Sequence, residues 1–249
     1  MNVAAYLRRI NYHGATEATA ETLRGLHLAH LLAVPFENLD IHLGREIVLD
    51  AARVAAKVVE RRRGGFCYEL NGAFAGLLTA LSFDVKMLAA GVARADGSFG
   101  PLFDHMALLV QLAEPWLADV GFGDSFREPL RLDDEGEQAQ GLSAYRVRRD
   151  GEQRVLERRN GDGAWQPQYR FTMQPYEYGD YAEMCRYHQT SPQSHFTQKR
   201  VCTRATPEGR VTLTNNRLIT TMGSDRHERE LADESEIAAV LRNHFGVVL

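Results

Sequence analysis

The cysteine of the segment RGGFCYELNG stands where a nucleophile could be activated. Cys67 follows a basic run and a Gly-Gly pair, and apolar residues recur after it at the spacing of one helical face. They are Leu70, Phe74, Leu77, Leu78 and Leu81. A thiolate at a helix N-terminus faces free backbone N–H groups, so we expect the pKa of the Cys67 thiol to fall below about 8.5. The alternative is a buried structural cysteine, the commoner role of a free thiol.

His105 and Asp119 are the candidates for completing such a site. A catalytic thiol needs a base within reach, and that base needs a third group to fix its tautomer and stabilise its charge. His105 begins the apolar run HMALLVQLA, and Asp119 ends WLAD before a glycine-containing loop. Both could lie at one rim of a sheet. Taken singly, His105 fits a strand-end imidazole and Asp119 fits a turn former equally well.

The two remaining cysteines show no such setting. Cys185 and Cys202 follow neither a basic run nor a helix start, and we expect them to be inert packing residues. Three cysteines without C-x-x-C spacing indicate neither a disulfide framework nor a zinc site, so we expect no metal. The cysteine usage predicts a reducing cytoplasm.

Composition indicates an ordinary globular chain. Of its 249 residues, 44% are hydrophobic and 25% charged, with a net charge of -4. No basic stripe with interleaved aromatics is present, which argues against a nucleic-acid partner. The N-terminus lacks the apolar run of a signal peptide, and no stretch approaches the roughly 18 apolar residues of a membrane span. We therefore expect a cytoplasmic protein without a membrane partner.

The predicted secondary structure changes along the chain. The first third predicts helices, one of them capped by Asp50 and ended by Gly64 and Gly65, with VPFENLDIHLG as a loop. From Asp84, short β-like runs follow one another, among them VKMLAAGVA, LSAYRVRR, QRVLERR and QPQYRFTM. Two more strands, RVTLTNN and RLITTM, precede a helix after Asp233. In that helix Glu236 occupies the capping-box position.

Four ordered segments give this chain a specific resemblance. VPFENLDIHLG, RGGFCYELNG, DHMALLV and WLADVGFG resemble the signature segments of the arylamine N-acetyltransferases. The resemblance is strongest in the first half and continues more loosely through YRF and SPQSHF to the last helix. It implies that Cys67, His105 and Asp119 form the catalytic triad.

The resemblance also implies the fold. We expect an α+β protein of three packed units: a helical bundle at 1–83 with the nucleophile, an antiparallel β-barrel at 84–190 with the histidine and aspartate, and an α/β lid at 191–249. The cysteine core is expected to be papain-like or transglutaminase-like.

The implied reaction is acetyl transfer from acetyl-CoA to an arylamine or arylhydrazine through an acetyl-cysteine. We expect the cofactor near Gly123, Asp124 and Ser125, the substrate ring near Phe36, Phe122 and Tyr68, and oxyanion donors at the Cys67 or Tyr68 N–H. Two departures bear on the cofactor. The chain ends at FGVVL, and position 124 is an aspartate where a small residue is expected, so its charge should repel phosphates.

Three other readings stay open on the sequence. The order Cys, His, Asp also fits a transglutaminase-like cysteine hydrolase acting on peptide carbonyls, and an amide synthase that closes macrocycles without CoA. A catalytically inactive binding module would need a broken triad, which this chain does not have. The sequence does not specify the preferred amine, the acyl chain length or the oligomeric state.

Overall fold

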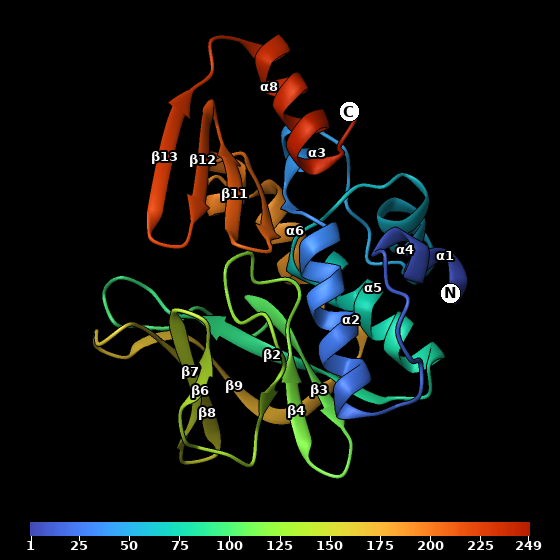
Figure 1. The fold of residues 1–249 in the computed structure, drawn as a ribbon, viewed down its shortest axis with the longest axis vertical. Coiled ribbons are helices and arrows are strands. Elements are labelled where there is room, and N and C mark those ends of the chain that lie inside the picture. The colour runs from blue at the N-terminus through green and yellow to red at the C-terminus, as the bar shows by residue number, and fades with distance from the viewer.

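A β-barrel, a helical unit beside it and a second sheet above it make up the fold (Figure 1). The computed structural model describes all residues 1–249. The expected α+β fold of three packed units is confirmed. The boundaries after residues 83 and 190 stay predictions; β2 (Asp84–Val92) follows the first, and α6 (Ala182–Thr190) ends at the second.

Polar side chains cap the main helices. Asn2, Thr19, Asp50 and Asp233 each accept a backbone N–H bond from the first turn of the helix that follows. Glu236 does not close the expected capping box, because its carboxylate accepts from the N–H of Ala232 rather than from Asp233. The other helices are α1 (Val3–Arg9), α2 (Ala20–Ala33), α3 (Leu39–His42), α4 (Ala51–Ala55), α5 (Cys67–Ala80), α7 (His195–Gln198) and α8 (Glu234–Val240); π-helical turns at Ala56–Glu60 and Leu241–Phe245 extend α4 and α8, and a 3-10 turn at Tyr178–Tyr181 precedes α6.

The barrel is an eight-stranded antiparallel sheet in the order β5-β4-β3-β2-β9-β8-β7-β6. Side-chain amides connect its two edge strands. Gln138 accepts the N–H of Arg131 at 2.8 Å and donates to the carbonyl of the same residue at 3.0 Å, which imitates strand pairing. The strands are β3 (His105–Gln111), β4 (Pro115–Ala118), β5 (Leu130–Arg131), β6 (Gln138–Gln140), β7 (Ser143–Asp150), β8 (Gln153–Asn160) and β9 (Gln166–Tyr176), with β2 as above.

The second sheet has the order β1-β10-β11-β12-β13. Its first strand, β1 (Phe36–Glu37), comes from the segment VPFENLDIHLG, which also forms α3; the expected loop is therefore wrong. The remaining strands are β10 (Val201–Thr206), β11 (Gly209–Thr214), β12 (Arg217–Met222) and β13 (Asp225–Glu230). The N-terminal part of the chain thus contributes directly to the C-terminal sheet.

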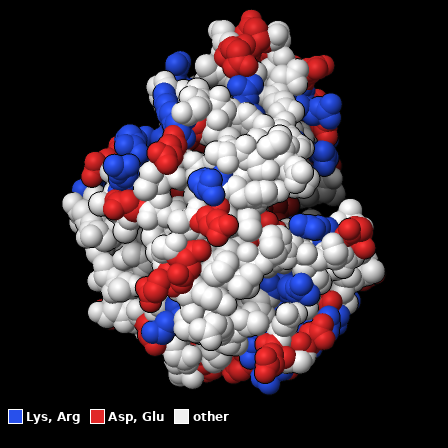
Figure 2. Space-filling view, turned by 180° about the vertical axis from the view of Figure 1, so that it is seen from behind, with Lys and Arg blue, Asp and Glu red and all other residues white.

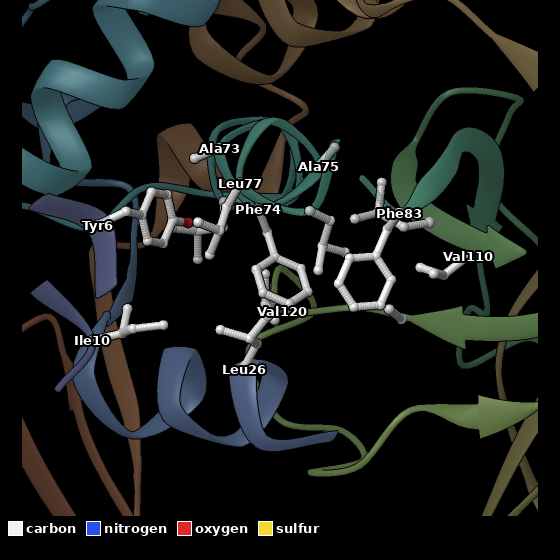
Figure 3. Packing of buried hydrophobic residues seen from close by; sticks show 14 of the residues in the cluster. Tyr6, Ile10, Leu26, Ala73, Phe74, Ala75, Leu77, Phe83, Val110 and Val120 are labelled. Atoms are coloured by element: carbon white, nitrogen blue, oxygen red, sulfur yellow. The ribbon is translucent and has the colours of Figure 1, made fainter. Parts of the chain in front are cut away.

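The helical unit packs on α5. Leu70, Phe74, Leu77 and Leu78 are fully buried, and Leu81, at the C-cap, is partly buried, so the predicted apolar stripe is confirmed. Figure 3 shows the Phe74 and Leu77 side chains of α5 directed toward Leu26 of α2. Burying such a phenylalanine contributes about 2–3 kcal/mol. This core fixes α5, and with it Cys67, against α2.

The helix before α5 ends earlier than expected. It stops at Glu60, and Arg62 adopts a positive φ of 53°, so Gly64 and Gly65 do not end it. Gly64 serves another purpose, since a Cβ there would lie 1.9 Å from the carbonyl oxygen of Pro35. The absence of a side chain allows the chain before Cys67 to pass against the segment that leads into β1.

The surface carries acidic and basic side chains interspersed, as the face in Figure 2 shows. A notch with basic side chains on its lower rim is visible at the right-hand edge of this face. Among the helices, none combines the length and the apolar character that crossing a bilayer requires.

The buried histidines His27 and His30 predict that stability falls in mild acid. Burial lowers the pKa of His27 from 6.5 to about 4 and that of His30 well below 6.5. Between pH 6.5 and 4 the unfolded chain therefore binds protons that the folded chain does not, so the free energy of unfolding should decrease as the pH falls. The share of this decrease that comes from His27 alone should be about 3 kcal/mol.

Thermal or urea unfolding between pH 7 and 4 measures this decrease. His30→Gln should make the pH dependence shallower, whereas His13→Gln, at an exposed position, should leave it as in the wild type. Equal stability of the wild type at pH 7 and pH 5 would contradict the prediction.

Candidate functional site

Cys67, His105 and Asp119 each lie at the end of a regular element. Cys67 is the first residue of α5, His105 is the first of β3, and Asp119 directly follows β4. Strands β3 and β4 are antiparallel, so the start of one and the end of the other share a rim of the barrel. The structure brings His105 and Asp119 together at this rim.

A short hydrogen bond joins the histidine to the aspartate. His105 Nε2 lies 2.7 Å from Asp119 Oδ2, and the two side chains are 3% and 0% exposed. The bond leaves the Nδ1 atom of His105 as the ring nitrogen not engaged by the carboxylate. This is the orientation role that a triad requires of its third member.

The second oxygen of Asp119 is also occupied. Its Oδ1 accepts from Asn71 Nδ2 and from the N–H of Gly121, both at 2.9 Å. Burial acts to raise the pKa of Asp119, but His105 and these two donors hold it below its ordinary value. Asp119 is therefore a buried, ionised carboxylate.

The loop after Asp119 lies directly against the start of α5. A Cβ on Gly121 would be 2.8 Å from the Cα of Cys67 and 2.7 Å from Asn71 Nδ2, so only glycine fits. Asn71, one turn beyond Cys67, donates to the Met106 carbonyl at 2.6 Å and accepts from the N–H of Val120 at 2.9 Å. The cysteine helix, β3 and the Asp119 loop are thus connected.

Glu69, in the first turn of α5, stabilises the N-terminus of this helix. Its Oε2 accepts the N–H of Phe66 at 3.2 Å, and its Oε1 lies 2.7 Å from Lys57 Nζ. Burial raises the pKa of Glu69 to about 7, against the opposing effect of Lys57.

Buried arginine completes this ionic cluster. Arg63 Nη2 lies 2.8 Å from Glu37 Oε1 and 3.0 Å from Asp40 Oδ1, and Lys57 Nζ lies 2.7 Å from Asp40 Oδ2. Each charge has an opposite partner, which buried ions require. The cluster therefore links the residues that precede Cys67 in the chain to the segment that forms β1 and α3.

The Cys67 thiol itself corrects one expectation. Burial raises its pKa, and a backbone hydrogen bond from Met106 opposes this. Desolvation, which disfavours a thiolate, outweighs the lowering of the pKa expected from the helix terminus. The surroundings of Cys67 therefore oppose ionisation of its thiol, and a thiolate there would need a cationic partner.

Cys185 and Cys202 are buried free thiols. Burial raises the pKa of Cys185 to about 12 and that of Cys202 well above its ordinary value. The Cys185 sulfur accepts a hydrogen bond from Gln189 Nε2 at 3.2 Å. Nowhere does the structure place three or more His, Cys, Asp or Glu side chains so that they could hold a metal ion.

A cleft of about 950 Å³ opens between the barrel and the second sheet. Five of the residues predicted to bind ligands line it: Phe36, Phe122, Gly123, Asp124 and Ser125. Phe122 connects the cleft to the His105–Asp119 pair, because its ring packs edge-on against His105 with centroids 5.2 Å apart.

Tyr68 is not among the cleft residues. Its side chain is fully buried, its hydroxyl donates to the Phe103 carbonyl at 2.6 Å, and its ring packs on Phe66 and Tyr181. The structure therefore does not support the prediction that Tyr68 contacts substrate, because the helical direction of α5 turns this side chain into the core.

Asp124 is paired rather than isolated. Its Oδ1 lies 3.0 Å from Arg210 Nε, and its Oδ2 lies 3.2 Å from Arg158 Nη1. Two arginines against one carboxylate leave this wall of the cleft positive. This pairing offsets the negative charge by which Asp124 was expected to repel phosphates.

Sequence reasoning missed Asn71, His27 and Tyr169. Asn71 carried a usable signal, since it lies four residues after Cys67 and therefore on the same helical face. His27 accepts the N–H of Asp119 at 3.1 Å, and Tyr169 packs on His105 with ring centroids 5.1 Å apart. Neither contact has a local sequence signal.

Comparisons with known proteins agree with this geometry. A family model described as N-acetyltransferase matches residues 19–249. The chain is 38% identical over 246 residues to an arylamine N-acetyltransferase of Escherichia coli, covering 97% of this chain and 87% of that protein. It is 34% identical over 249 residues to a proansamycin X synthase of Amycolatopsis mediterranei, covering 96% and 95%.

A solved structure shows the same fold. The arylamine N-acetyltransferase of Mycobacterium marinum in complex with CoA has a TM-score of 0.91 and 33% identity, covering 99% of this chain and 93% of that one. The match spans all three units, including the cysteine helix and the strands that carry His105 and Asp119. This chain therefore belongs to the arylamine N-acetyltransferase family of acyltransferases.

Proposed function

We propose that the protein N-acetylates arylamines and arylhydrazines with acetyl-CoA as the donor, through an acetyl-Cys67 intermediate. The observation that carries this is the buried His105–Asp119 pair: the loop after Asp119 packs at Gly121 against Cys67, the first residue of α5, and the His105 ring packs against Phe122, which lines the cleft. A cysteine, a base and an orienting carboxylate are the groups that covalent acyl transfer requires. Family membership supplies the acetyl donor and the amine class.

In the first half-reaction, the Cys67 thiolate attacks the thioester carbonyl carbon and forms a C–S bond. The tetrahedral intermediate then expels the sulfur of CoA, which takes the proton held by His105. Exchange of one thioester for another is nearly neutral in free energy. The backbone N–H groups of Cys67 and Tyr68 make no hydrogen bond within the protein and are the proposed donors to the oxyanion.

In the second half-reaction, the amine nitrogen attacks the acetyl-Cys67 carbonyl carbon. His105 accepts the amine proton, and the intermediate expels the Cys67 thiolate, which restores the ion pair. Asp119 stabilises the imidazolium in both halves. Formation of an amide from a thioester makes this half favourable.

The cleft provides a place for both substrates. We assign CoA to the wall that includes Gly123, Asp124 and Ser125, where Arg158 and Arg210 offer positive charge to its phosphates. The arylamine ring is assigned to Phe122 and Phe36, whose faces are apolar and line the inner cleft. The three free cysteines support a reducing, cytoplasmic location.

An amide synthase is the second candidate. Similarity to a proansamycin X synthase favours it, and its chemistry would need the same Cys67, His105 and Asp119. It would join an amine and an acyl group of one molecule and would need no CoA. The arginines around Asp124 favour a phosphate-bearing donor and hence the first candidate.

Mass spectrometry tests the proposal on the intact protein. Incubation with acetyl-CoA alone should place one acetyl group on the peptide that contains Cys67, and a subsequent arylamine should remove it as the acetylated amine. Cys67→Ala should show no adduct. The Cys185→Ala, Cys202→Ala double variant should be acetylated within a few-fold of the wild-type rate, because those thiols are not activated.

Absence of an adduct on Cys67 would refute acetyl-CoA as the donor and leave the amide synthase. An adduct that water removes as fast as amine does would instead indicate a hydrolase.

Replacement of Asp124 tests the CoA wall. Asp124→Ser frees Arg158 and Arg210 to pair with phosphates, so the KM for acetyl-CoA should fall about fivefold, the size expected for one partly exposed ion pair. Arg210→Gln should raise it. Initial rates against acetyl-CoA concentration give both values; a higher KM in Asp124→Ser would show that Asp124 positions the arginines instead.

A further inference from the structure

A fully buried histidine connects the two ends of the loop that forms the cleft wall. His27 lies in the middle of α2 and is 0% exposed. Its Nε2 accepts the backbone N–H of Asp119 at 3.1 Å, and its Nδ1 lies 2.8 Å from the carbonyl oxygen of Arg127. One imidazole therefore bonds both ends of the loop 119–127.

These two partners determine the protonation of the ring. A backbone N–H can only donate and a carbonyl oxygen can only accept, so Nε2 must present a lone pair and Nδ1 must carry the proton. A proton on Nε2 would face the N–H of Asp119 and break that bond. His27 works only as the neutral Nδ1–H tautomer.

The loop that His27 holds has a functional group at either end. At its start, Asp119 bonds His105. At its end, the Arg127 guanidinium donates to the carbonyls of Pro207 and Gly209 at 2.9 and 2.6 Å, at the turn between β10 and β11. Between them, Phe126 stacks on the His27 ring, with centroids 5.6 Å apart and planes 12° apart.

We propose that His27 is a positioning residue. At one end of the loop it holds Asp119 in hydrogen-bonding position to His105, and at the other end it holds the cleft wall against the second sheet. The two ends of the loop serve different steps. The Asp119 end supports ionisation of Cys67, and the Arg127 end shapes the cleft that receives acetyl-CoA; this second part rests on the proposed function.

His30 is a second buried histidine of the same helix, and its hydrogen bonding is confined to the helical unit. It lies three residues further along α2, is equally buried, and its Nδ1 lies 3.1 Å from the Tyr6 hydroxyl of α1. It contacts neither the loop 119–127 nor the triad by hydrogen bond. It is therefore a matched control for effects of burial and helix stability.

Two substitutions separate the two bonds of His27. The amide N–H of Asn occupies the place of Nδ1, so His27→Asn keeps the donor to Arg127 and loses the bond to Asp119. The amide oxygen of Gln occupies the place of Nε2, so His27→Gln keeps the acceptor for Asp119 and loses the bond to Arg127.

The readouts differ for the two variants. His27→Asn should slow Cys67 acetylation about tenfold or more and shift the pH profile of iodoacetamide alkylation upward, with the KM for acetyl-CoA unchanged. His27→Gln should leave the alkylation profile unchanged and raise the KM for acetyl-CoA several-fold. His30→Asn and His30→Gln should lower the melting temperature without altering either kinetic readout of the folded protein.

Two results would overturn the proposal: His27 variants that behave like their His30 counterparts, or Asn and Gln variants with the same kinetic change. The alkylation profile needs no CoA, so it tests the Asp119 end even if acetyl transfer itself failed. Should the variants not fold, ¹⁵N NMR of the wild type decides. A neutral His27 ring protonated at Nδ1 supports the proposal, and protonation at Nε2 refutes it.

Discussion

The buried charge of Asp119 is the constraint on which the site depends. A carboxylate removed from water is unfavourable unless every lone pair finds a donor. Here His105, Asn71 and the N–H of Gly121 supply those donors from β3, α5 and the loop itself. Three separate parts of the chain must therefore meet at one point, and their meeting is also what orients the imidazole.

Cys67 depends on this arrangement because its own surroundings oppose ionisation. Burial raises the pKa of the thiol, so the start of α5 alone does not make a nucleophile. In the proposed mechanism a His105 imidazolium stabilised by Asp119 offsets that cost, which requires the start of α5 to be held in place. Glu69 and Lys57 provide this support through the Phe66 N–H and a buried ion pair.

Local patterns predicted the parts of this structure that are determined locally. The apolar period of α5, the Asp50 cap and the ordered segments around Cys67, His105 and Asp119 are readable because each depends on neighbouring residues. Contacts between residues distant in the sequence could not be predicted in this way. The arginines of Asp124 lie 34 and 86 residues away, and β13, exposed at every position, shows no alternation that would predict a strand. Desolvation of Cys67 was missed for the same reason.

The rate of Cys67 alkylation by iodoacetamide as a function of pH measures the central claim most directly. The wild type should show an inflection below pH 7, because the His105–Asp119 pair supports a thiolate despite burial. In Asp119→Asn the inflection should move up toward or beyond the free-thiol value of about 8.5, since the imidazolium loses its charged partner. A single inflection at or above that value in the wild type, unchanged in Asp119→Asn, would contradict the account.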